Sequence, residues 1–132
     1  MKKITFILLS LSFTFFTSCS SDEVPGGGEH QINPPQWIHG EWLQEDSDGN
    51  SHGYRFTPDD LVIIMLPLES SQKSMLNQMA QGGYEVSTSE TITEDQYSLT
   101  TNFDGQVMTY NFFKVSDTEI YWENSENIFV KQ

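Results

Sequence analysis

The chain has 132 residues, which is the length of one small domain, and its 19 acidic against 6 basic residues give a formal net charge of −13. This charge excludes nucleic acid as a partner, because neutralising phosphates requires clustered Lys and Arg. It also disfavours electrostatic adsorption to anionic lipid. The hydrophobic content of 36%, with 13% aromatic residues, is sufficient for a small core, so the chain is predicted to fold.

The first 18 residues have the pattern of a secretory signal peptide. Lys2 and Lys3 precede an apolar run over residues 4–16. This run is too short for a membrane span, which needs about 20 residues, and has the usual length of a signal-peptide core. It leads through Phe16-Thr17-Ser18 to Cys19, the single cysteine of the chain, so we expect no intramolecular disulfide and no Cys-ligated metal site.

Residues 16–19 resemble the lipobox of bacterial lipoproteins, in which small residues precede a lipidated cysteine. The resemblance implies cleavage after residue 18, diacylglycerol on the sulfur of Cys19 and acylation of the new amino group. Two or more acyl chains anchor a protein stably, so the resemblance implies a lipid-anchored protein of the outer membrane. The alternative is a secreted protein or a buried core cysteine without lipid.

The segment from Cys19 to residue 35 is predicted to be a flexible tether. It contains the acidic run Ser20-Ser21-Asp22-Glu23 and the Gly- and Pro-rich residues 24–35. Such residues bury too little apolar area to order themselves. The acidic run is similar to the export signal of cell-surface lipoproteins, and its alternative interpretation is a solvated spacer. We therefore expect a signal peptide over 1–18, a tether over 19–35 and a folded domain over 36–132.

The folded domain is dominated by the two-residue alternation of half-buried strands. One helix is predicted over residues 70–82, with Ser70 or Ser71 as its cap and Gly82-Gly83 as its end. The predicted strands cover residues 37–44, 54–56, 61–66, 84–92, 97–103, 107–115, 120–122 and 128–130.

Eight short strands joined mostly by tight turns predict a mainly β fold. The expected architecture is a small eight-stranded antiparallel up-and-down barrel with one short helix inserted after the third strand, because closure removes exposed sheet edges. The alternative is an α+β fold, in which the helix packs on a four- or five-stranded antiparallel sheet.

The motif Gly40-Glu41-Trp42, followed by Tyr54-x-Phe56 and this strand count, resembles the lipocalin-like domains of small Bacteroidetes-type lipoproteins over residues 35–132. In lipocalins the glycine permits close approach at the barrel floor, and the tryptophan closes the floor against an arginine of a late strand. This chain departs from the pattern, since only Lys114 and Lys131 are available in its late strands.

Patterns for catalysis or metal binding are weak, so we expect a protein that is not an enzyme and has no cofactor. The three histidines, His30, His39 and His52, all lie in the N-terminal part of the chain, and no Gly-x-Ser-x-Gly occurs. His39 and His52 lack a third metal ligand at fixed spacing. Residues 46–50 carry oxygen ligands but lack the distal glutamate of a calcium loop, and therefore indicate a hairpin turn.

Binding is the expected class of function. The sequence favours an outer-membrane-anchored lipoprotein that acts as a non-catalytic binding or scaffolding module for a protein partner at the cell envelope. The alternative is a lipocalin-like carrier of a small hydrophobic or glycan ligand in a shallow barrel pocket, and an envelope hydrolase is a remote alternative. A dry pocket would support the carrier, and a filled interior with exposed apolar residues would support the module. The candidate ligand-binding residues are Met65, Met108, Tyr110, Phe112 and Trp42.

Overall fold

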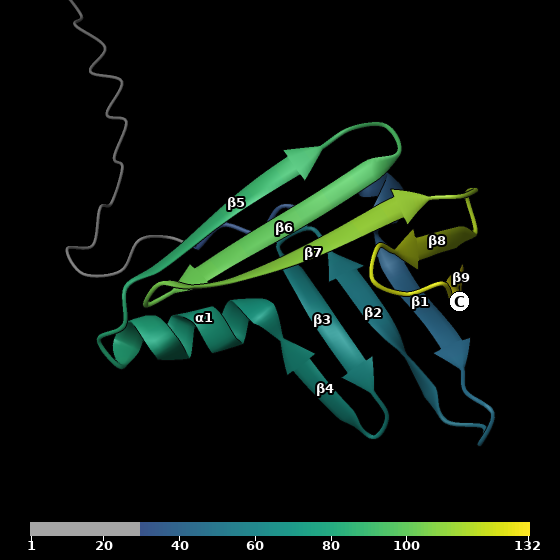
Figure 1. Cartoon of the computed structure of the whole chain (residues 1–132), viewed down its shortest axis with the longest axis horizontal. Helices are drawn as coiled ribbons and strands as arrows, with labels where there is room; N and C mark the ends of the chain where they lie inside the picture. The colour runs from purple at the N-terminus through teal and green to yellow at the C-terminus, as the bar shows by residue number, and fades with distance from the viewer. Residues whose placement is uncertain (1–29) are drawn as a thin grey trace, which may run out of the picture.

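The computed structural model describes residues 30–132 (Figure 1). The predicted signal peptide (1–18), the lipidation site Cys19 and the tether up to residue 29 lie outside the described residues. The elements are a 3₁₀-helix η1 (Gln36–Ile38), the helix α1 (Gln72–Gln81) and the strands β1 (Gly40–Glu45), β2 (Ser51–Thr57), β3 (Asp60–Met65), β4 (Leu68–Ser71), β5 (Val86–Ile92), β6 (Gln96–Phe103), β7 (Gln106–Lys114), β8 (Glu119–Trp122) and β9 (Ile128–Lys131).

All nine strands belong to one antiparallel sheet, in the order β4-β3-β2-β1-β9-β8-β7-β6-β5. Neighbours in the sheet are consecutive in sequence except at β1 and β9, where Trp42 pairs with Lys131 and Leu43 with Val130. The sheet curls into a half-barrel whose two ends, β4 and β5, are connected by α1 (Figure 1). The predicted mainly β, up-and-down architecture is therefore confirmed, and the alternative of a helix on a four- or five-stranded sheet is not adopted.

The predicted count of eight strands is wrong by one, and the helix follows the fourth strand instead of the third. The additional strand is β4, which pairs with β3 through Met65↔Leu68 and Val62↔Ser71. Pro67 has no N–H to donate to a ladder, so the apolar run that begins at Leu61 turns there and returns as a second strand. The strand predicted from the sequence ends at residue 66, and no element is predicted between it and the helix.

Helix α1 has the predicted ends. Ser71 is the N-cap, and its hydroxyl oxygen accepts a hydrogen bond from the backbone N–H of Ser74 at 3.0 Å. Gly82 is the C-cap. The helix buries Leu76 fully and half-buries Met75 and Met79, so its apolar stripe packs on the sheet beside β3.

Aromatic rings fill the interior of the curled sheet. The ring of Phe112 lies edge-on to Tyr54 and to Phe56, with centroids 4.8 and 4.9 Å apart, and Phe56 lies edge-on to Tyr97 at 5.9 Å. Such edge-to-face pairs stabilise a core beyond the apolar area they bury. Trp42, Tyr97 and Phe112 are fully buried, so these rings form the centre of the core.

The Gly-x-Trp motif lies in β1, and its tryptophan is fully buried in this core. Gly40 has φ +122°, a backbone conformation that residues with a Cβ rarely adopt, and the side chain of Lys131 lies over it, with Cε 2.9 Å from where a Cβ would be. The ammonium of Lys131 lies 5.0 Å from the ring centroid of Trp42. A lysine of the last strand thus packs on this tryptophan.

The folded domain begins before the predicted boundary at residue 36. Ile32 is only 2% exposed and belongs to the core, and Pro34 is also buried. The segment lies against β5, where the hydroxyl of Thr88 donates to the carbonyl of Gln31 at 2.9 Å. The backbone N–H of Asn33 donates to the Glu90 carboxylate at 2.6 Å. Residues 30–35 are thus packed, and the expected flexible tether does not extend over them.

Candidate functional site

The candidate site is a cleft between the N-terminal segment, the β2–β3 turn and α1, the helix that connects the two ends of the sheet. Residues from the N-terminal segment, the β2–β3 turn and α1 line a cavity of about 310 Å³ there, which we call the seam cleft. Its lining residues are His30, Gln31, Ile32, Asn33, Asp59, Lys73 and Asn77.

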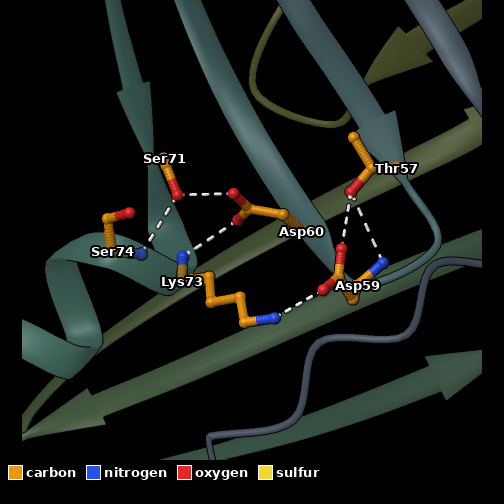
Figure 2. Close-up of polar contacts among 6 residues, drawn as sticks. All are labelled: Thr57, Asp59, Asp60, Ser71, Lys73 and Ser74. Carbon is orange, nitrogen blue, oxygen red and sulfur yellow. Dashed lines mark hydrogen bonds and ion pairs between the residues drawn. The ribbon is translucent and has the colours of Figure 1, made fainter.

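Asp60 fixes the start of α1 beside this cleft (Figure 2). Its carboxylate accepts a hydrogen bond from the hydroxyl of Ser71 and another from the backbone N–H of Lys73 at 2.9 Å. The first N–H groups of a helix have no partner within the helix, so Asp60 acts as a second cap next to Ser71. The β2–β3 turn and α1 are therefore held together by a carboxylate of which each oxygen accepts a hydrogen bond from the start of the helix.

Asp59, the neighbouring turn residue, forms an ion pair with the ammonium of Lys73 (Figure 2). The hydroxyl of Thr57 donates to the same carboxylate at 3.2 Å. The hydrogen bond from Lys73 holds the pKa of Asp59 below its usual value, and the same bond raises the pKa of Lys73. Both side chains are solvent-exposed, so the pair contributes little to stability, and either group can exchange its partner for a ligand.

His30 supplies the one strongly buried polar group of the cleft. The residue is 8% exposed, and its Nε2 has no hydrogen-bond partner. Burial lowers the pKa of His30, so its imidazole is neutral at pH 7. Buried polar atoms are normally paired, and this orphan nitrogen marks a position where a ligand atom would gain a hydrogen bond.

The cleft has the chemistry of binding more than that of catalysis. The hydroxyl of Ser71 donates to Asp60 and accepts from Ser74, so it serves as a helix cap. A nucleophile would need a base such as His to remove this proton. Within residues 30–132 no group of three or more His, Cys, Asp or Glu is arranged to hold a metal ion. His39 Nε2 lies 2.8 Å from the Pro34 carbonyl oxygen, and the ring of His52 lies edge-on to Phe129.

The five candidate ligand-binding residues do not line one pocket among those found in the described part of the chain. Trp42, Tyr110 and Phe112 are buried in the core, whereas Met65 is 62% and Met108 is 43% exposed. Met108 shares a strand face with Tyr110 and Phe112, since it precedes them by even steps, and Met65 is paired with His52. They lie at the ends of their strands, beyond the packed interior, so alternation alone does not bury them.

Sequence reasoning missed the seam cleft itself. Asp59, Lys73 and Asn77 are separated in sequence and meet only because the sheet curls, so no local pattern identifies them. The one available signal was Ile32, an isolated large apolar residue inside a polar segment, which packs in the core next to His30.

No helix within residues 30–132 has the length and apolar character needed to cross a membrane. Comparison of the chain with protein-family models, with curated proteins and with solved structures finds no match.

Proposed function

We propose that this chain is an envelope lipoprotein, anchored in the outer membrane through Cys19, whose domain is a non-catalytic module that binds or scaffolds a protein partner. The anchoring half of the proposal is supported by the leader, the small residues before Cys19 and the absence of other cysteines. The binding half is supported by one structural observation. The interior is filled by aromatic side chains, while large apolar side chains are exposed at the β3–β4 turn.

The filled interior favours the partner-binding module over a carrier of an apolar molecule. A carrier needs an apolar cavity, and an eight-stranded barrel holds at most one small ligand when its side chains leave room. Here Tyr54, Phe56 and Phe112 contact one another across the centre. Apolar side chains exposed together on a surface are typical of sites that bind another macromolecule.

A small hydroxyl-rich ligand, such as a glycan, in the seam cleft is the second candidate. It is favoured by the orphan Nε2 of His30 and by the amides of Asn33 and Asn77, which offer both donors and acceptors. Glycan binding that is lost in the Asn77→Leu variant and retained in Gln78→Leu, a control on the same helix, would support this candidate.

The anchor is tested by the mass of the protein purified from its envelope. We expect the N-terminal peptide to begin at Cys19 and to carry the mass of acyl chains, because acylation on sulfur and amine follows cleavage. The Cys19→Ala variant should keep residues 1–18, and Ser20→Ala should be processed normally. An unmodified Cys19 in the wild-type chain would contradict the anchor.

The proposal of a partner-binding module is tested by native mass spectrometry of the protein purified from its envelope. We expect no apolar small molecule to remain bound to the folded chain, because the packed rings leave no room for one. A co-purifying lipid or other apolar compound that dissociates only on unfolding would contradict the module and favour the carrier.

A further inference from the structure

Apolar side chains gather at the tip of the β3–β4 hairpin. Met65, Leu66 and Leu68 are 62%, 50% and 69% exposed, and Met65 is paired directly with Leu68. Single exposed apolar residues are common on proteins, but three large ones on one tight turn form a continuous apolar surface. We call residues 65–68 the apolar tip.

A strongly acidic turn lies beside the apolar tip. Glu45, the last residue of β1, pairs with Ser51, and the backbone N–H of Leu66 donates to the carbonyl of Ser51 at 3.4 Å. The β1–β2 turn that follows Glu45 carries Asp46 and Asp48. The hydrogen bond from the backbone N–H of Asn50 holds the pKa of Asp46 below its usual value, so this carboxylate stays ionised at neutral pH.

The Lys and Arg residues of 30–132 do not balance the charge of this acidic turn, and the nearby imidazole of His52 makes only the smallest contribution to lowering the pKa of Asp46. Each of the four Lys and Arg residues in that range is engaged elsewhere. Arg55 binds Glu41 and Glu69, and Lys73 binds Asp59. Lys114 binds Asp117, and Lys131 lies over the ring of Trp42. Three carboxylates therefore lie beside the apolar tip without an ion-pair partner in the described structure.

We propose that the apolar tip and the β1–β2 turn together form the docking surface for a basic, amphipathic segment of a protein partner. This inference rests on the proposed binding module and names its partner class. Apolar side chains of the segment would cover Leu66 and Leu68, and its Lys or Arg side chains would meet Glu45 and Asp48.

The negative charge of the chain favours this partner over the other molecules that could cover an apolar surface. A second copy of the chain would bring two proteins of net charge −13 together at their acidic turns, where like charges repel. An anionic bilayer would meet the same repulsion. A basic segment is attracted by the acids and also removes the apolar tip from water.

The docking surface is tested with the full chain in phosphatidylcholine nanodiscs and a synthetic leucine–lysine peptide of amphipathic periodicity. A photoreactive benzoylphenylalanine replaces Leu66 in one variant and Val107, which is at least as exposed on another hairpin, in a control. After irradiation we expect the variant at 66 to crosslink to the peptide and the variant at 107 not to do so. Crosslinks from position 66 to lipid or to a second copy would overturn the proposal in favour of those occupants.

Binding of the peptide to unlabelled variants gives the second measurement. We expect Leu66→Ser combined with Leu68→Ser to raise the half-saturating peptide concentration by about tenfold, because apolar contacts are lost. Val107→Ser combined with Val115→Ser is the matched control and should change it by less than about twofold.

The charge contribution is tested separately. Glu45→Gln combined with Asp48→Asn should weaken binding by about threefold or more and reduce its dependence on salt, since both effects come from lost attraction. Glu85→Gln combined with Glu94→Gln makes the same change in net charge elsewhere. Equal effects of the two pairs, or equal binding of a leucine–glutamate peptide, would overturn the docking surface. The anchor and the absence of an interior ligand would still stand, because their tests are independent.

Discussion

Replacing Trp42 with alanine is the most direct test of how this domain is held together. Trp42 is fully buried, and its indole Nε1–H donates to the carbonyl oxygen of Ile38 at 2.7 Å. It pairs with Tyr54 in β2 and with Lys131 in β9, so it lies at the position where the two halves of the meander meet. Trp42→Ala therefore removes a ring from the core and a donor from a buried carbonyl at once.

The expected cost is about 3–5 kcal/mol in the free energy of unfolding, the usual range for a large aromatic residue replaced by alanine. We expect the upper part of this range, because the Ile38 carbonyl would lose its buried donor. A domain of this size has about 5–15 kcal/mol in total. With a urea dependence of about 1–3 kcal/mol per molar, the unfolding midpoint should fall by about 2 M.

Urea unfolding followed by far-ultraviolet circular dichroism measures this midpoint. Trp37→Ala is the matched control, since Trp37 is only half-buried and its Nε1–H donates to the carbonyl of Thr93 at 3.0 Å. The control should cost about 1–2 kcal/mol, because less apolar area is lost. Equal shifts for the two variants, or an unchanged midpoint for Trp42→Ala, would refute the assignment of Trp42 to the centre of the core.

Two further predictions concern the helix cap and the buried phenols. Asp60→Ala should lower the free energy of unfolding by about 1–2 kcal/mol, because the first turn of α1 loses its second cap. The exposed Asp59→Ala should scarcely move the same urea midpoint, and an equal loss would contradict the capping role. Burial raises the pKa of Tyr54 to about 12, and burial with the hydrogen bond to Glu90 raises that of Tyr97 further. The fold favours the protonated phenols, so their stabilisation is present below about pH 10 and is lost as the pH rises towards 12 and beyond. Tyrosinate absorbance should accordingly appear together with unfolding in an alkaline titration, and full ionisation of all tyrosines near pH 10 in the folded chain would contradict this.

Local signals in the sequence predicted the elements of this fold well. Ser71 and the Gly82-Gly83 pair mark the ends of α1, and both act through backbone groups within one turn. Two-residue alternation predicted the strands β6 and β7, in which Leu99, Tyr110 and Phe112 are buried at alternate positions. Strand β4, which was not predicted, also has a local cause, because Pro67 indicates a turn inside the apolar run.

Features that depend on contacts between residues distant in the sequence could not be predicted from local patterns. The exposure of Met65 and Met108 depends on where the packed interior ends along the strands. The composition of residues 30–35 indicates disorder, yet Ile32 finds a place in the core that only the curled sheet provides. The seam cleft likewise exists only after the N-terminal segment, the β2–β3 turn and α1 have been brought together.

The way in which the first described residues are attached has a mechanical consequence. A pull from the N-terminal side acts first on residues 30–35, which are hydrogen-bonded to the side chains of Thr88 and Glu90 in β5. These contacts can break one after another, and withdrawing Ile32 from the core costs about 1.5–3 kcal/mol. Detaching these six residues would lengthen the segment that precedes the folded domain by about 20 Å, while the hydrogen-bonded strands keep their register. Under tension the domain can therefore release this extra length of chain before its strands separate.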